Sequence, residues 1–349
     1  MWIDRAGNVI GVLRGRATGP SVQFNAHLDH VDVGDPALWP HPPYAAVIEG
    51  DTLFGRGASD VKGAMAAQVY LAPVLREAGL QPDGDVYVVG VVLEEVGGYG
   101  SEFLAQTMPT DAAVLAEATN NELRRGHRGR VFVRVSFTGL SAHASAPERA
   151  INPHYAIARF LLRLESLPMR TDETFGASTV APTLIESDQR SGNVTPATIA
   201  VYLDWRTIPS ESVESLVATL RPLVAAVERE IDGITGKIEI VGREVRTYTG
   251  LSATMPSTSG FETAANHLVL LTAQATLESL LGRPVPVSTW TFATDGGHLA
   301  RHGITTIGFA PGEERFAHTI HDQISLHKMT EALAGNAALA CALTAEAHS

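Results

Sequence analysis

The stretch that most constrains the fold is Val91–Gly98, VVLEEVGG, in which an apolar run ends in two adjacent carboxylates and two glycines. An apolar run of this length between turn residues is typical of a buried strand in a parallel sheet. Successive side chains on a strand point to opposite faces. Glu94 and Glu95 are therefore expected to do different jobs at one site, one binding a metal and one handling a proton. Taken alone, the stretch fits a charged strand end that faces water equally well.

Two further apolar runs are followed by residues that can bind metals. Ser21–Asp32 predicts a strand on which His27 and Asp29 share a face, so that the Asp29 carboxylate can accept the second ring N–H of a metal-bound histidine. Ala112–Leu115 predicts another buried strand, and Glu117 follows it. Because ligands bind at the carboxyl ends of strands in an open α/β sheet, these side chains are expected to converge.

A glycine-rich turn, Phe54–Gly63 (FGRGASDVKG), precedes an alanine-rich helix that we expect to run to about Ala78. The turn lacks the Walker spacing, and Asp60 stands where the dinucleotide-binding pattern has its third glycine. We expect the turn to present Asp60 at the start of the helix, where the helix dipole favours a carboxylate. A simple capping acid is the alternative interpretation.

The pattern changes after Arg124, where Gly129–Gly139 alternates apolar and polar residues as a half-exposed antiparallel strand does. The elements expected from here on follow the order β-α-β-β-α-β, which is that of the ferredoxin-like split motif. We therefore expect residues 126–244 to form a domain inserted into an α/β domain made of residues 1–125 and 245–349. In the second part of that α/β domain, a helix is expected over about Phe261–Leu281 and a strand over Ile304–Phe309.

Composition excludes several classes of partner. The chain has 26 Lys and Arg against 38 Asp and Glu, a net charge of −12, and no basic stripe. Nucleic acid and anionic membrane surfaces are therefore not expected as partners. The single cysteine, Cys341, excludes an internal disulfide. With no signal peptide or membrane-spanning run recognised, we expect a cytoplasmic protein.

Together these stretches resemble a co-catalytic zinc metallopeptidase family of clan MH. The family includes acetylornithine deacetylase, succinyl-diaminopimelate desuccinylase, aminoacylase and carboxypeptidase G. The segments SAPERAIN and WTFATDGG look closest to the deacetylase-like hydrolases that include the selenium-metabolism group. The resemblance covers nearly the whole chain. It implies a zinc-peptidase-like mixed sheet with flanking helices, plus an inserted ferredoxin-like α+β domain that serves as lid and dimerisation domain.

The resemblance also implies two divalent metal ions, zinc most commonly, with cobalt or manganese as alternatives. By the same resemblance Asp29 would orient a metal-bound histidine and Glu94 would be the general base. The implied reaction is amide hydrolysis of a small N-acyl amino acid by metal-activated water, with a dipeptidase or carboxypeptidase as the alternative. The implied metal ligands are His27 and Glu117 for one ion, Glu95 and His318 for the other, and Asp60 as the bridge.

The inserted domain would supply contacts to a small substrate with a free carboxylate. His143 in SAHASAP resembles the histidine that stabilises the oxyanion from the partner subunit of a homodimer. Its alternative is a loop histidine that caps the next helix. Arg206 in DWRTIP resembles the arginine that holds the substrate carboxylate, and its alternative is an ion pair with Asp204. Further implied substrate contacts are Asn193 in GNVTP and the glycines Gly296 and Gly297.

Two departures from the family pattern accompany the resemblance. The family's last ligand usually sits in A-H-x-x-N/D-E, whereas this chain has AHTIHDQ, so His321 is an alternative to His318. The family usually has several dozen helical residues before the first hairpin, whereas this chain starts almost at that hairpin, so either its start is set too late or that helical part is missing. A metal-binding homologue without turnover is a further alternative, although it would need no unligated base at Glu94.

Overall fold

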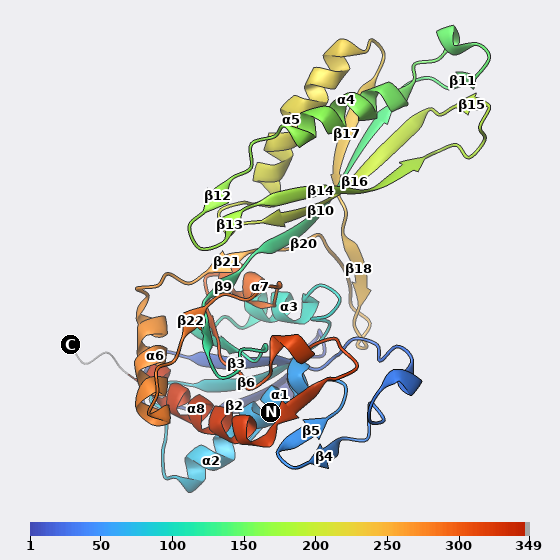
Figure 1. The fold of residues 1–349 in the computed structure, drawn as a ribbon. Coiled ribbons are helices and arrows are strands. Elements are labelled where there is room, and N and C mark those ends of the chain that lie inside the picture. The colour runs from blue at the N-terminus through green and yellow to red at the C-terminus, as the bar shows by residue number, and fades with distance from the viewer. Residues whose placement is uncertain (346–349) are drawn as a thin grey trace. The chain divides into compact units, whose positions relative to one another are not determined.

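The computed structural model describes residues 1–345 and divides into two units (Figure 1). The first unit contains Met1–His127, Glu244–Met255 and the chain from Phe261 onward. The second contains Arg128–Arg243 and Pro256–Gly260. This division corrects the expectation that all residues after 244 belong to the first unit. Residues 256–260 join the second unit because β20 (Ser257–Thr258) pairs antiparallel with β10 (Gly129–Thr138).

A mixed sheet forms the centre of the first unit, as expected. Its order is β1-β2-β6-β3-β7-β23-β8-β22. The strand bounds, in sheet order, are Trp2–Ile3, Val9–Leu13, Val86–Val91, Val22–His27, Ala112–Leu115, Thr305–Gly308, Leu123–Arg124 and Val287–Ser288. The neighbours β6, β3, β7 and β23 run parallel to one another. Their carboxyl ends therefore lie along one edge of the sheet.

Helices cover both faces of this sheet, and alternate strand residues separate the two cores. Val114 packs with α1 (Gly63–Val69), α2 (Leu71–Glu77), α6 (Leu268–Leu281) and α8 (Leu326–Thr344). Its neighbours Ala113 and Leu115 pack on the opposite face with α3 (Tyr99–Thr107) and α7 (Gly296–Arg301). This alternation is what a strand buried on both faces requires.

Two helices differ from their predicted extents. The helix expected to run from Gly63 to about Ala78 is divided at Tyr70 into α1 and α2. Pro73 explains the division, because it has no N–H to donate to the carbonyl of Val69. The helix expected from Phe261 begins at Leu268, because Phe261–Glu262 is instead β21, paired with β9 (Gly126–His127).

The second unit has the predicted ferredoxin-like order. Its antiparallel sheet runs β14 (Thr179–Ser187), β16 (Thr198–Thr207), β10 and β17 (Thr235–Ile240). The helices α4 (Pro153–Glu165) and α5 (Val213–Glu230) bury a shared core against this sheet. Both begin at a capping residue, Asn152 for α4 and Ser212 for α5.

The remaining strands form one three-stranded sheet, β24 (Gln323–Ser325), β5 (Thr52–Phe54) and β4 (Val47–Glu49) in that order, and three short pairs. The pairs are β11 (Ala142–His143) with β15 (Val194–Thr195), β12 (Thr171–Asp172) with β13 (Gly176–Ala177), and β18 (Arg243–Arg246) with β19 (Ser252–Met255). None of the helices within residues 1–345 combines the length and apolarity needed to cross a bilayer.

Candidate metal centre

The first ligand cluster lies at the carboxyl ends of β3 and β7. His27 is the last residue of β3, and Glu117 follows β7 by two positions. The His27 Nε2 atom lies 2.9 Å from Oδ1 of Asp60 and 3.8 Å from Oε1 of Glu117. All three side chains are buried. One imidazole and two carboxylates directed at a common point form a set of ligands that a divalent metal accepts.

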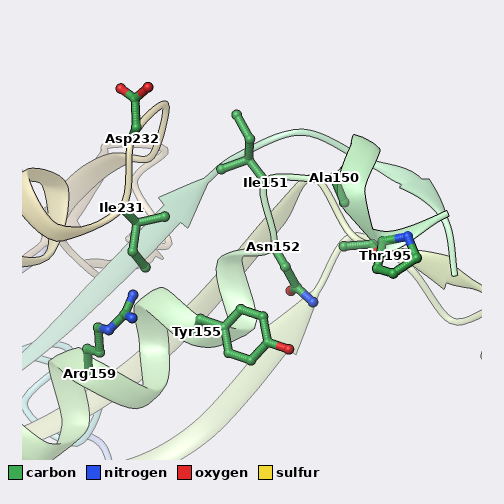
Figure 2. Close-up of a pocket in the computed structure, with 9 residues that line it drawn as sticks. Ala150, Ile151, Asn152, Tyr155, Arg159, Thr195, Ile231 and Asp232 are labelled. Carbon is green, nitrogen blue, oxygen red and sulfur yellow. The ribbon is translucent and has the colours of Figure 1, made fainter.

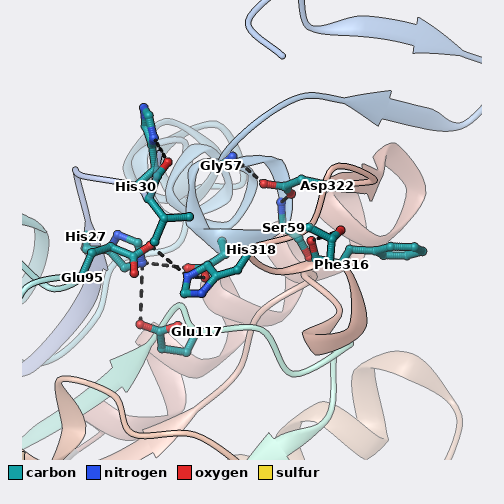
Figure 3. Close-up of polar contacts among 12 residues, drawn as sticks. His27, His30, Gly57, Ser59, Glu95, Glu117, Phe316, His318 and Asp322 are labelled. Atoms are coloured by element: carbon teal, nitrogen blue, oxygen red, sulfur yellow. Dashed lines mark hydrogen bonds and ion pairs between the residues drawn. The ribbon is translucent and has the colours of Figure 1, made fainter. Parts of the chain in front are cut away.

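The second cluster uses the other oxygen of Asp60. The His318 Nε2 atom lies 3.1 Å from Oδ2 of Asp60 and 3.1 Å from Oε1 of Glu95 (Figure 3). Within residues 1–345, the groups whose ligand atoms lie within 4.8 Å of one another are His27, Asp60, Glu117 and Asp60, Glu95, His318. The structure thus brings together the five ligands that the sequence implied, with Asp60 shared between them.

Asp60 lies in a tight turn before α1 rather than in the first helical turn. The segment Ala58–Lys62 is an irregular turn in which Asp60 has φ −135° and ψ 89°, and α1 begins only at Gly63. The Asp60–Val61 peptide bond is cis. The glycine-rich turn thus presents Asp60 just before a helix, as expected, but three positions ahead of the first residue of α1. The turn directs the carboxylate by its own backbone shape.

Glu94 and Glu95 also lie in a turn rather than on the strand. β6 ends at Val91, Leu93 has φ +63°, and the N–H of Gly98 bonds the carbonyl of Leu93. The strand alternation expected for the two acids does not apply, because the backbone has already turned. The two glutamates nevertheless have different surroundings: Glu95 contacts His318, whereas Glu94 belongs to neither ligand cluster among the described residues.

Asp29 fixes this turn. Its Oδ1 accepts the backbone N–H of Glu94 and its Oδ2 that of Glu95, each at 3.2 Å. The expected contact of its carboxylate with the His27 ring is long, 3.8 Å from Nδ1 to Oδ1. Instead the backbone carbonyl of Asp29 lies 3.0 Å from Nδ1, because β3 has ended at His27. A carbonyl can only accept, so Nδ1 carries a proton, and once Nε2 is deprotonated it can bind a metal.

The charges of the site fit a bound cation. Burial and the charge of Asp60 raise the pKa of Glu117 well above its usual value. Burial opposes ionisation of Asp60, but hydrogen bonds from His27 and His318 lower its pKa below the usual range. Hydrogen bonds to Asp60 and Glu95 raise the pKa of His318 to about 10. Bound protons thus offset part of the negative charge of these carboxylates. This is expected of metal ligands in the absence of the metal, because the cation would otherwise neutralise that charge.

His321, the alternative last ligand, is exposed and belongs to neither cluster among the described residues.

Sequence reasoning missed two buried carboxylates near the site. Asp295 accepts a hydrogen bond of 2.6 Å from the Ser101 hydroxyl, and burial raises its pKa. Asp322 accepts hydrogen bonds from the turn that carries Asp60. Both lie in motifs singled out for other residues, TDGG and AHTIHDQ, and those motifs are the signal that could have revealed them.

Gly296 of the TDGG motif packs against the protein's own core. A side chain at Gly296 would meet the Phe261 ring at 2.3 Å and Leu115 at 2.9 Å. Gly297 is buried beside it in the first turn of α7. The expectation of substrate contacts at these glycines is therefore wrong for Gly296, whose missing side chain makes room for the protein's own core.

The other predicted substrate residues belong to the second unit. His143 on β11 lies next to Asn193, since the N–H of Ala144 bonds the Asn193 carbonyl at 2.9 Å. Arg206 on β16 donates its Nε–H to Asp204 at 2.8 Å, the ion pair that the sequence offered as the alternative. Asp204 also accepts Nη2–H of Arg130 at 2.8 Å.

A surface pocket of about 260 Å³ also lies in the second unit (Figure 2). Ile151 and Ile231 give it an apolar part, and Tyr155 and Arg159 a polar part. None of the predicted site residues lines it.

Comparison with known proteins relates this geometry to a family. The family model described as peptidase family M20/M25/M40 matches residues 23–342. An uncharacterized protein named YgeY from Escherichia coli (strain K12) is 31% identical over 340 residues, covering 92% of this chain and 80% of that protein. A succinyl-diaminopimelate desuccinylase from Paracoccus denitrificans is 29% identical over 265 residues, covering 68% of this chain and 69% of that protein.

Among solved structures, the Bacillus subtilis YXEP protein superposes with a TM-score of 0.71 at 15% identity, covering 99% of this chain and 87% of that one. It is described as a dinuclear metal binding peptidase from the M20 family. At this identity the likeness concerns the fold.

Proposed function

The chain belongs to peptidase family M20/M25/M40, and we propose that it is a dinuclear-metal amidohydrolase that removes the acyl group from a small N-acyl amino acid. Family membership makes it a metal-dependent hydrolase of amide bonds. One observation carries the finer proposal. Asp60 directs Oδ1 to His27 and Oδ2 to His318, which is the arrangement of a carboxylate shared by two metal ions.

Each ion would be held by one histidine and one glutamate in addition to Asp60. The ligands are His27 and Glu117 for the first ion and Glu95 and His318 for the second. Imidazole and carboxylate ligands suit zinc, and also cobalt or manganese. When bound, the metals would lower the pKa of a water molecule and polarise the substrate carbonyl.

Glu94 is our candidate for the general base. It adjoins the ligand Glu95 and lies outside both clusters, and Asp29 holds the backbone of the turn on which it sits. Burial and the neighbouring charge of Glu117 raise the pKa of Glu94 well above its usual value. A carboxylate that readily holds a proton can take one from the attacking water and deliver it to the leaving amine nitrogen. A protein that only stored metal would need no such group.

His143 is our candidate for stabilising the oxyanion. Its Nδ1 accepts the backbone N–H of Ser145 at 3.1 Å and lies 2.8 Å from the Ser145 hydroxyl oxygen. The neutral ring therefore carries its proton on Nε2, where it can be donated to a developing negative oxygen. Following the resemblance, we propose that this donor acts in the partner subunit of a homodimer.

The edge of the second unit's sheet supports a homodimer. β14 is the terminal strand of that sheet, and its side chains are mostly exposed. Leu184 and Ile185 on it are 52% and 54% exposed. A long edge strand with exposed apolar residues is a template for pairing with another strand.

Arg206 and Asn193 are our candidates for substrate binding. The Arg206 guanidinium is planar and can pair with a carboxylate through two hydrogen bonds. It is nearly half exposed although it is paired with Asp204, so one of its edges can still receive a substrate carboxylate.

The relative from Paracoccus denitrificans is named a desuccinylase, and removal of an acyl group from an amine is the reaction class proposed here. The lone Cys341 suits a reducing compartment, and we propose the cytoplasm.

A substrate panel tests this function. Metal-free protein is reconstituted with Zn²⁺, Co²⁺ or Mn²⁺ and given N-acetyl and N-succinyl amino acids, dipeptides, and the methyl ester of each. We expect metal-dependent release of the free amino acid from an acylated substrate, and much slower hydrolysis of the matching ester. Preference for dipeptides would favour the dipeptidase or carboxypeptidase alternative, and equal hydrolysis of esters would exclude the Arg206 clamp. Failure with every substrate and metal, while both ions bind, would favour the non-catalytic alternative.

A further inference from the structure

Asp322 connects the two segments that carry Asp60 and His318. It follows His318 by four positions and is 1% exposed. Its Oδ2 accepts the backbone N–H of Gly57 at 2.7 Å, and its Oδ1 accepts that of Ser59 at 2.9 Å (Figure 3). Arg56 adds an ion pair of 3.2 Å from Nη1 to Oδ2. One buried carboxylate thus binds three donors, from Arg56, Gly57 and Ser59, on the turn before Asp60.

Further contacts fix both ends of this connection. On the far side of Asp322, its own carbonyl accepts the N–H of Gly55 at 3.0 Å, and Gln323 pairs with Phe54 in the β24–β5 ladder. Before His318, the Ser59 hydroxyl accepts the N–H of Glu313 at 2.7 Å and donates to its carbonyl at 3.1 Å. The turn that carries Asp60 is therefore bound to both ends of the loop that carries His318.

The loop needs such support, because His318 has a backbone conformation that favours glycine. Its φ is +60°. A non-glycine residue in this region is strained and persists only where its surroundings hold it. The His318 side chain is also 53% exposed, so burial of the imidazole contributes little to holding it. The fixed points of the loop are therefore Asp322 and Glu313.

We propose that Asp322 is a positioning residue for the second metal ion: by binding the Gly57 and Ser59 amides it sets the distance between Asp60 and His318. The proposal rests on the two-metal function proposed above. The first ion has His27 and Glu117, which lie at the ends of strands of the central sheet and have no bond to Asp322. Loss of Asp322 should therefore lower the affinity for the second ion more than the affinity for the first.

Asparagine is the informative replacement at this position. Both oxygens of Asp322 accept N–H groups, and an asparagine of the same shape can offer only one oxygen. Its amide nitrogen would face a second donor, so one of the two backbone bonds is lost. Residues that orient metal ligands without binding the metal typically contribute roughly 10–100-fold to metal affinity. We therefore expect Asp322→Asn to lower the affinity for the second ion by that factor.

The experiment is a titration of metal-free protein with Zn²⁺ in the presence of a chromophoric chelator, repeated with Co²⁺ followed by its visible spectrum. Wild type is expected to bind two ions. Asp322→Asn is expected to bind the first ion within a few-fold of wild type, and to bind the second roughly 10–100-fold more weakly.

Arg56→Gln is the matched control. It removes the ion pair with Asp322 but keeps both backbone bonds, so it should lower thermal stability while both ions bind as in wild type. If Asp322→Asn does not fold because the Arg56 charge is left buried without its partner, the double variant Arg56→Gln with Asp322→Asn removes that charge. The double variant is expected to show the same selective loss of the second ion.

Four outcomes decide the proposal. Selective loss of the second ion in the asparagine variants, but not in Arg56→Gln, supports it. Two ions bound as tightly as in wild type overturn it, and so does an equal loss of both ions, which would mean that Asp322 only stabilises the fold. A wild-type protein that binds a single ion would instead overturn the two-metal function, and the positioning role with it.

Discussion

The imidazole Nε2 atom of His27 lies 2.9 Å from Oδ1 of Asp60, a contact between residues 33 positions apart. Since the second oxygen of Asp60 faces His318, one carboxylate serves both ligand clusters. No other residue among those described is common to the two clusters. The loss of different ligands should therefore have different consequences, which the first prediction uses.

Asp60→Asn should abolish tight binding of both ions, whereas Glu117→Gln should abolish binding of only one. The amide of Asp60→Asn cannot supply an anionic oxygen to each of two cations. Glu117→Gln should affect one ion because Glu117 contacts only the His27 side of the site. Metal analysis after dialysis against buffered Zn²⁺ measures the number of ions bound. Retention of even one ion at wild-type affinity in Asp60→Asn would refute the shared carboxylate.

Zinc binding should release protons. In the metal-free protein, the hydrogen bonds to Asp60 and Glu95 raise the pKa of His318 to about 10. Burial opposes protonation of His27, but the bond to Asp60 raises its pKa well above the usual value. The His318 ring is then protonated at neutral pH and the pKa of His27 is shifted in the same direction, whereas a metal binds only the deprotonated nitrogen of each ring. Apparent zinc affinity should therefore rise with pH until about pH 10, where His318 titrates.

Calorimetry in two buffers with different ionisation enthalpies measures this release. At neutral pH the binding enthalpy should depend on the buffer, because protons are lost from His318 and from the two other ligands whose pKa values are raised, His27 and Glu117. Binding enthalpies that do not depend on the buffer would show that the rings are already neutral.

Glu94→Gln should keep both ions and bind substrate, while kcat falls by about 10²–10⁴-fold, the usual contribution of a positioned acid–base group. KM should change little, because glutamine has nearly the same shape. Glu95→Gln is the matched neighbour and should lose an ion. If Glu94→Gln loses the ion and Glu95→Gln keeps it, the roles of the adjacent pair are reversed.

His143→Ala should fold, bind both ions and dimerise, but its kcat should fall by about 10²–10³-fold, as for loss of one oxyanion donor. Mixing it with Glu94→Ala under conditions of subunit exchange should restore activity. In the mixed dimer, one site has an intact Glu94 and receives His143 from its partner. Absence of recovery despite demonstrated exchange would mean that His143 acts in its own subunit or outside catalysis.

Glu102→Gln should destabilise the protein in a pH-dependent way. Glu102 on α3 accepts hydrogen bonds from His298 at 3.2 Å and from His302 at 3.0 Å, and it pairs with Arg301. Burial opposes ionisation of Glu102, but these contacts lower its pKa below the usual range. The stabilisation is present at neutral pH and is lost as the pH falls through the lowered pKa.

Hydrogen bonds to charged groups contribute about 1.5–3 kcal/mol, and the variant should lose about this much at pH 7. Denaturant unfolding between pH 7 and acid pH measures the difference from wild type, which should shrink as the pH falls. The exposed Glu77→Gln is the control and should show no such trend. A loss for Glu102→Gln that is constant with pH would point to altered packing.

The convergence of the side chains that follow β3, β6 and β7 could be predicted from the sequence because it depends on topology, whereas Asp60 and His318 were assigned as ligands only through the family resemblance. Apolar runs bounded by turns marked β3, β6 and β7, and the carboxyl ends of parallel neighbours necessarily meet at one edge. His27 and Glu117 follow directly from that rule. For Glu94 and Glu95 the rule predicts the location but not the direction of each side chain, because strand alternation does not apply to a turn that begins after Val91.

Residues whose roles depend on distant segments could not be inferred in this way. Asp322 bonds the N–H of Gly57, which lies 265 positions away, and no periodicity in the sequence relates the two. The resemblance implied a substrate contact at Gly296, but the Phe261 ring lies where a side chain at that position would be, and no pattern in the sequence relates the two residues.

The pairing of β20 with β10 has a consequence for genetic exchange. The chain passes between the units after His127, Arg243, Met255 and Gly260, so the second unit is encoded by two separate stretches of sequence. A recombination event that replaced only 128–243 would place a foreign β10 beside the original β20. Exchange of this unit between relatives is therefore expected to succeed when both stretches are inherited together, and a short module of five residues, 256–260, must travel with a much longer one.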